Sequence, residues 1–186
     1  MSLPSASSIC QLPRSIQISS LNELFEPCPT LTSYIIPRVF QADSIYDSYT
    51  QIVESIRSHL MVLRSQYQTN PTPDLKRIID AIVGAHPRLG APKQVLLSTN
   101  SQSEQNSLNG GDPNLTKKLT QLNDLYESTF PGLRYVVFVN GRSREVIMRN
   151  MKMRIQRHDF LAEVVEAFNA MCDIALDRAR KLGAKM

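Results

Sequence analysis

The residue types best suited to proton transfer lie in GAHPRLG, residues 84–90, directly after the amphipathic run DLKRIIDAIV. Pro87 disfavours a helical backbone at His86, so a stiff turn would set the direction of the imidazole ring. An imidazole with a pKa near ~6.5 can accept or donate a proton at neutral pH. His86 could instead be a C-terminal helix cap that the helix dipole favours. The motif alone leaves both interpretations open.

A second candidate is SQSEQ, residues 101–105. On a helix, Ser101, Glu104 and Gln105 would lie on or near one face, because they are three and four positions apart. Ser-x-x-Glu is also the pattern of a capping box, in which Glu104 would only bond back to the Ser101 amide. The two roles are compatible, since a capped helix start can present Gln105 and its own N–H groups to an anion.

The third candidate is VNGRS, residues 139–143, where Gly141 permits a tight bend after an apolar run. An arginine held on such a turn, here Arg142, can clamp a carboxylate with two parallel hydrogen bonds. The alternative is a solvated loop charge.

Other kinds of site are not predicted. His86 and His158 have no histidine or cysteine partner four positions away, so we expect no metal site. Cys10, Cys28 and Cys172 show neither zinc spacing nor a disulfide framework, which fits a reducing compartment. No glycine-rich phosphate loop is present, and no residue pattern indicates a cofactor.

Composition bounds the class of protein. The chain has 186 residues, 42% hydrophobic and 20% charged, with a net charge of +4, as in an ordinary globular protein. No apolar run approaches the ~18 residues of a membrane span, and the N-terminus lacks a secretory signal. The late basic surplus is interrupted by acidic residues, so nucleic-acid binding is the weakest interpretation.

Periodicity predicts one all-α domain over residues 16–183, after a loose segment 1–15. Ser20, Asp74 and Ser143 are expected helix caps, and Pro27 and Pro29 are expected to end the first helix. The apolar run at 135–139 cannot make a sheet alone, so we expect a buried extended segment. The expected helices cover residues 20–25, 44–67, 75–85, 115–130, 143–155 and 160–183, the last stopping at Gly183.

Taken in order, these motifs resemble the OHCU decarboxylases of ureide catabolism, and in particular a eukaryotic, fungal-like member. The motifs are LNELFEPCP, IIDAIVGAHPRLG, SQSEQ and QLNDLYESTFPGLRYVVFVNGRS, and they span most of the chain. Members of this family convert 2-oxo-4-hydroxy-4-carboxy-5-ureidoimidazoline (OHCU) to (S)-allantoin. The resemblance implies an all-helical fold, a homodimer, a small-molecule substrate and a reaction without cofactor.

The resemblance also implies roles for single residues. The catalytic group would be His86, Glu104 and Arg142. The substrate would be lined by Pro87, Ser101, Gln105 and the backbone of Val137, Phe138 and Val139. Residues 184–186, AKM, resemble a peroxisomal targeting tripeptide, which implies an import receptor as partner and a peroxisomal rather than cytoplasmic location.

Two alternatives remain. The chain has no tryptophan, and NSLNGGDPN follows the Glu-Gln pair where the family has a short Ala-Gly stretch. A diverged, non-catalytic helical interaction module with the same fold would explain both features. The basic late helices leave nucleic-acid binding as the other alternative.

Overall fold

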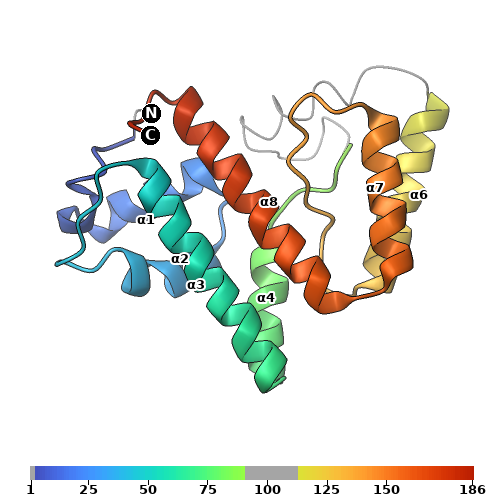
Figure 1. The fold of residues 1–186 in the computed structure, drawn as a ribbon, viewed down its shortest axis with the longest axis horizontal. Coiled ribbons are helices and arrows are strands. Elements are labelled where there is room, and N and C mark those ends of the chain that lie inside the picture. The colour runs from blue at the N-terminus through green and yellow to red at the C-terminus, as the bar shows by residue number, and fades with distance from the viewer. Residues whose placement is uncertain (1–2, 91–112) are drawn as a thin grey trace.

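The computed structural model describes residues 3–90 and 113–186 (Figure 1). These residues form helices, with no β-strand among them, so the all-α prediction is confirmed. The elements are a short 3-10 helix η1 (Ile9–Gln11), α1 (Arg14–Leu24), α2 (Pro29–Val39), α3 (Tyr49–Thr69), α4 (Pro73–Gly84), α6 (Pro113–Thr129), α7 (Arg144–Arg157) and α8 (Phe160–Lys181).

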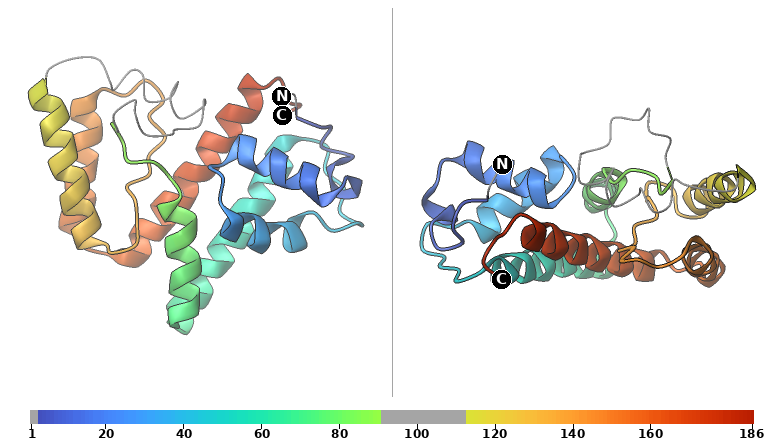
Figure 2. Two further views of the ribbon diagram at one scale, coloured as in Figure 1. Left: turned by 180° about the vertical axis from the view of Figure 1, so that it is seen from behind. Right: turned by 90° about the horizontal axis from the view of Figure 1, so that it is seen from above.

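Helix α8 is the central element. It packs along α3, while α1 and α2 lie at one end of the molecule and α6 and α7 at the other (Figure 2). Its apolar positions recur three and four apart, so that one stripe faces the core along the whole helix. The fully or almost fully buried members of this stripe are Val164, Ala167, Phe168, Met171, Cys172, Ala175 and Ala179.

The N-terminal segment is packed, contrary to the prediction that residues 1–15 are loose. Ile9 is fully buried, and the Gln17 side-chain amide donates to its carbonyl at 3.1 Å. Helix α1 begins at Arg14, six positions before the predicted cap Ser20, whose hydroxyl donates to the Ile16 carbonyl inside the helix. Pro13, just before the first helical residue, marks this start.

The two prolines after α1 have different roles, and only the first matches the prediction. Helix α1 ends at Leu24, before Pro27. Pro29 is also the first residue of α2, a helix that the sequence analysis missed. Proline suits this first position because its missing N–H would have no partner there anyway.

Two further helix starts differ from the prediction. Ser48 caps α3 by accepting from the Gln51 amide, so Ile45 lies before the helix and is 77% exposed. Thr72, rather than Asp74, caps α4 by accepting from the Leu75 amide. The apolar pattern therefore predicts the helix, but the capping side chain decides at which residue the helix begins.

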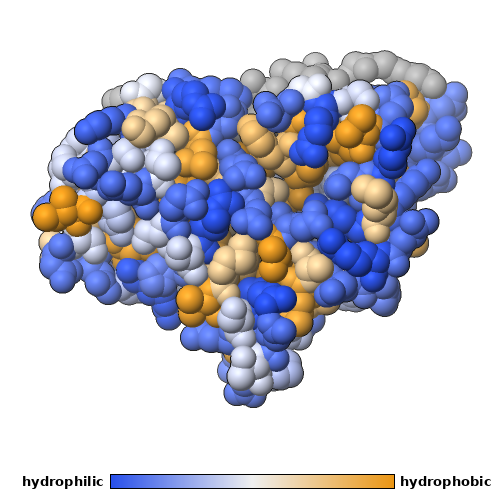
Figure 3. All heavy atoms as spheres, viewed as in Figure 1, coloured by the Kyte–Doolittle hydropathy of each residue, from blue (hydrophilic) through white to orange (hydrophobic). Residues whose placement is uncertain are grey.

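The expected helix boundaries at Ser143 and Gly183 are confirmed. Ser143 caps α7, and Gly183 adopts a left-handed φ of 73° just after α8. Residues 135–139 form the predicted extended segment, with Tyr135 and Val136 buried. No helix of the described part is both long and apolar enough to span a bilayer. The face seen in Figure 3 is mostly hydrophilic, with hydrophobic side chains in small groups.

Candidate functional site

His86 lies just beyond the end of α4, where the chain leaves the helix. Its backbone N–H donates to the Val83 carbonyl at 3.2 Å, and Pro87 prevents the helix from continuing. The residue is only 7% exposed. Its Nε2 atom is buried and has no hydrogen-bond partner among residues 3–90 and 113–186. A buried ring nitrogen that lacks a hydrogen-bond partner within the protein is available to a ligand.

Burial lowers the pKa of His86 to about 4, because a charged imidazolium is poorly solvated in the interior. The carboxylate of Glu26 raises this pKa and the guanidinium of Arg178 lowers it. At neutral pH the imidazole is therefore uncharged, and one ring nitrogen can accept a proton.

Helix α6 holds the loop that carries His86. The Asn123 side-chain amide, itself buried, donates to the Leu89 carbonyl at 3.0 Å. The Arg88 guanidinium forms two hydrogen bonds with the Glu127 carboxylate, at 2.7 and 2.6 Å. These contacts tie the loop to α6.

A buried ion pair lies within electrostatic reach of His86. The Arg178 guanidinium, on α8, contacts the Glu26 carboxylate at 2.8 Å and donates to the Leu24 carbonyl at 3.4 Å. Glu26 is 6% and Arg178 2% exposed. Charges in a low-dielectric interior interact strongly, so this pair and His86 form one electrostatic unit.

The extended segment begins against α4. The Lys76 ammonium donates to the Pro131 carbonyl at 3.0 Å and pairs with Asp80 at 2.6 Å. Gly132 has a φ of 96°, and a side chain there would overlap the Asp80 carboxylate. From this start the segment and the loop after α4 run side by side in both views (Figures 1 and 2).

A buried polar network then fixes the segment to α7 and α8. Arg154 donates to the Val136 carbonyl at 3.0 Å and to the Glu163 carboxylate at 2.7 Å. The Tyr126 hydroxyl also donates to Glu163, at 2.7 Å. Glu163 is fully buried and Arg154 is 3% exposed. An arginine on one helix therefore holds a backbone carbonyl of the segment that follows α6.

Arg142 and Arg144, on either side of the α7 cap Ser143, differ in exposure and in hydrogen bonding. Arg142 is exposed, and its guanidinium donates to the carbonyls of Phe138 and Val139. Arg144 is 9% exposed, and its Nε and Nη1 atoms are buried without a hydrogen-bond partner in the described part of the chain. Ser101, Glu104 and Gln105 lie outside the described residues.

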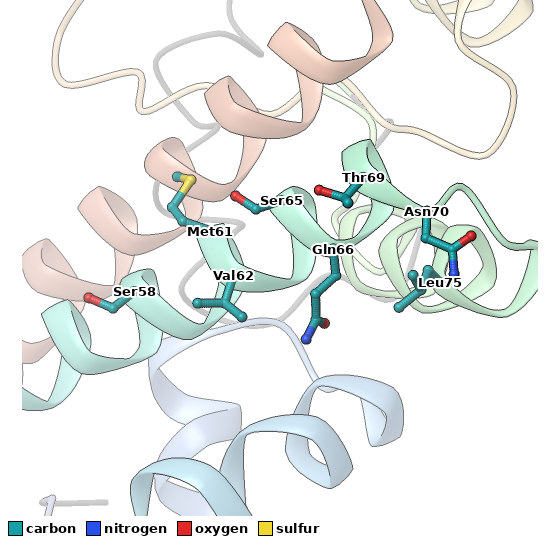
Figure 4. A pocket seen from close by; sticks show the side chains of 8 residues that line it. All are labelled: Ser58, Met61, Val62, Ser65, Gln66, Thr69, Asn70 and Leu75. Carbon is teal, nitrogen blue, oxygen red and sulfur yellow. The ribbon is translucent and has the colours of Figure 1, made fainter.

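A surface depression lies elsewhere. It has a volume of about 760 Å³ and follows the outer face of α3 (Figure 4). Its lining residues are Ser58, Met61, Val62, Ser65, Gln66, Thr69, Asn70 and Leu75. None of them titrates near neutral pH, so this depression cannot carry acid–base chemistry.

The profile of the family described as OHCU decarboxylase matches residues 10–180. The chain belongs to the OHCU decarboxylase family.

Two solved structures resemble this family member. One is the crystal structure of (S)-allantoin synthase, with a TM-score of 0.62 and 14% identity over 96% of this chain. The chain spans 54% of that protein. The other is an OHCU decarboxylase crystallised in the presence of (S)-allantoin, with a TM-score of 0.56 and 15% identity over 87% of this chain and 96% of that one. At these identities the likeness shows the fold. The sequence matches no curated protein.

Of the residues that the resemblance assigns to the site, His86 and Pro87 lie on the loop after α4, and Val137, Phe138 and Val139 lie on the extended segment. Ribbon views show only that the loop and the segment run side by side (Figures 1 and 2). The sequence analysis missed Glu26, Arg178 and Arg144, although a signal exists. Arg178 follows Met171, Ile174 and Ala175 at seven, four and three positions, so it lies on the apolar stripe of α8. A charge on such a stripe indicates a buried pair.

Proposed function

We propose that this OHCU decarboxylase family member converts OHCU to (S)-allantoin and carbon dioxide, without a cofactor. The observation that supports this most is the buried, uncharged imidazole of His86, whose Nε2 atom has no partner among the described residues and whose pKa responds to the Glu26–Arg178 pair. A neutral imidazole in a buried site can take a proton from a substrate hydroxyl.

The chemistry needs little more than orientation and proton transfer. The bond between ring carbon 4 and the carboxylate breaks, and its electron pair enters the conjugated C=N of the imidazoline. Carbon dioxide leaves, the ring nitrogen of the C=N and carbon 5 each gain a proton, and the hydroxyl loses its proton to become a carbonyl. One proton is consumed overall, and delivering the carbon 5 proton to one face of the ring sets the S configuration. Positioning and electrostatic stabilisation are what a rigid, buried site supplies.

In this proposal His86 accepts the proton of the substrate hydroxyl. Arg178, held by Glu26, contributes positive potential where negative charge develops on the ring. The backbone of residues 137–139 contacts the ring. Ser101, Glu104 and Gln105 would orient polar groups, and Arg142 would bind an anion or carbonyl; these roles remain predictions.

The test uses OHCU made freshly from urate by urate oxidase and hydroxyisourate hydrolase, followed by circular dichroism. Without catalysis, OHCU decays to racemic allantoin. We expect rapid appearance of an optically active product with the wild-type chain and racemic decay with His86→Ala. Racemic decay with a folded wild-type chain would instead favour the non-catalytic interaction module.

A homodimer and reading of residues 184–186 by the peroxisomal import receptor are further proposals. The Lys185 carbonyl accepts from the Tyr49 amide at 2.8 Å, while the side chains of Lys185 and Met186 are exposed. Deleting residues 184–186 from a fluorescently tagged protein should disperse its punctate distribution in the cell, and a diffuse distribution of the intact protein would contradict the targeting proposal.

Sedimentation should show twice the mass of one chain, and the mass of a single chain would contradict the homodimer.

A further inference from the structure

Three arginines have buried side chains in the described part of the chain, and they differ in what neutralises them. Arg154 contacts the buried carboxylate of Glu163, and Arg178 contacts that of Glu26. Arg144 is the exception, because its Nε and Nη1 atoms find no hydrogen-bond partner among the described residues. A guanidinium stays protonated in proteins, so burial without a partner is costly.

The position of Arg144 on α7 directs it toward the extended segment. The buried positions of α7 are Arg144, Ile147, Met151 and Arg154, which lie on one helix face. This face contacts the segment at two points. The Tyr135 hydroxyl donates to the Ile147 carbonyl at 3.4 Å, and Arg154 donates to the Val136 carbonyl. Arg144 therefore lies on the face that packs against the segment, one turn closer to the N-terminus than Ile147.

The surroundings of Arg144 favour an anion. It is the first residue of a 14-residue helix, where the free N–H groups and the helix dipole create positive potential. Side chains on a helix lean toward its N-terminus, which adds the guanidinium to the same region. The acid that follows Arg144 in the sequence, Glu145, is exposed, and its carboxylate accepts from its own backbone N–H and from Ser143. These two hydrogen bonds and, to a smaller extent, Arg144 lower the pKa of Glu145, but Nε and Nη1 of Arg144 have no hydrogen-bond partner among the described residues.

We propose that Arg144 binds the carboxylate of the substrate, with the ring against residues 137–139. The identity of the substrate rests on the proposed function; the carboxylate class rests on the buried Nε and Nη1 atoms of Arg144, which have no partner among the described residues. A guanidinium matches the planar geometry of a carboxylate. The product lacks this carboxylate, so Arg144 favours bound substrate over bound product. The contact stabilises the ground state, so its loss should raise KM more than it lowers kcat.

Binding of stable ring ligands tests the proposal without turnover. Hydantoin-5-acetate carries a carboxylate, whereas allantoin has the same ring and no charge. We expect calorimetry to show that Arg144→Met weakens hydantoin-5-acetate binding about 10- to 100-fold, the range of a charged hydrogen bond, and leaves allantoin binding unchanged. Arg144→Lys should restore part of the affinity. Arg149→Met, which removes an exposed arginine of the same helix, should change neither.

Two outcomes would overturn the proposal. One is equal hydantoin-5-acetate affinity in the wild type and Arg144→Met. The other is an Arg144-dependent site from which allantoin cannot displace hydantoin-5-acetate, because that would be an anion site separate from the ring site. Arg144→Met should also fold at least as stably as the wild type, since it removes an unpaired buried charge. If the chain binds the carboxylate as expected but does not turn over OHCU, the proposed function fails and the carboxylate site stands.

Discussion

The guanidinium of Arg178 lies 2.8 Å from the carboxylate of Glu26, although the two residues are 152 positions apart in the sequence. The contact joins the last helix to the segment that follows the first one. Both side chains are buried, and both affect the charge state of His86. The charge state of His86 therefore depends on a contact between segments from opposite ends of the chain.

Glu26→Gln should lower stability by about 3–5 kcal/mol, because it removes the carboxylate that contacts the buried guanidinium of Arg178 at 2.8 Å. Removing both charges, in Glu26→Gln with Arg178→Met, should recover much of this loss. Urea denaturation of the two single variants and the double variant measures the coupling. Additive losses would show that the ion pair contributes nothing beyond its separate members.

His86 should make stability depend on pH. Its folded-state pKa of about 4 lies below the ordinary value of 6.5, so the unfolded chain binds more protons between these values. The contribution is complete above pH 6.5 and is lost as the pH falls toward 4, by up to about 3 kcal/mol. In His86→Gln this part of the pH dependence should vanish in urea titrations at pH 4.5 and 7. Parallel profiles of the two proteins would show that the imidazole titrates normally.

The contacts of Glu163 with Tyr126, Arg154 and Arg157 allow a test in which partners of different strength are removed. Tyr126→Phe removes one hydroxyl from a carboxylate that keeps Arg154 and Arg157, so a loss of about 1–2 kcal/mol is expected. Arg154→Met should cost about 3–5 kcal/mol, because it strips a charged partner from the fully buried Glu163 and a donor from the Val136 carbonyl. Thermal and urea unfolding would check this order. Equal losses would mean that the network is not centred on Arg154.

Gly132 and Gly141 form a matched pair for a steric prediction. Both have positive φ, of 96° and 73°, so alanine is strained at either position. Only at Gly132 would the added carbon meet the Asp80 carboxylate, whereas at Gly141 the space is open. Gly141→Ala should cost about 1 kcal/mol, and Gly132→Ala clearly more, with weaker attachment of the extended segment to α4. Similar melting temperatures for the two variants would show that Asp80 moves aside without cost.

Much of this protein follows from local sequence. The periodicity of residues 49–69 and 160–181 predicts two long helices, because apolar residues three and four positions apart lie on one face of a helix and can be buried together. Ser143 and Gly183 mark helix ends through backbone chemistry that needs no partner. The His86-Pro87 pair indicates a constrained imidazole for the same reason. The family resemblance rests on such local motifs.

Tertiary structure decided the rest. The sequence does not reveal that Ile9 is buried, or that a helix begins at Pro29, because both depend on surfaces that other helices supply. The partners of Glu26 and Arg154 are equally hidden in the sequence, as is the lack of a hydrogen-bond partner for Nε and Nη1 of Arg144 among the described residues. The charge on a side chain is a property of its type, but whether that charge is paired, unpaired or solvated depends on which distant segments fold against it. The electrostatic character of this site is thus a property of the packed chain.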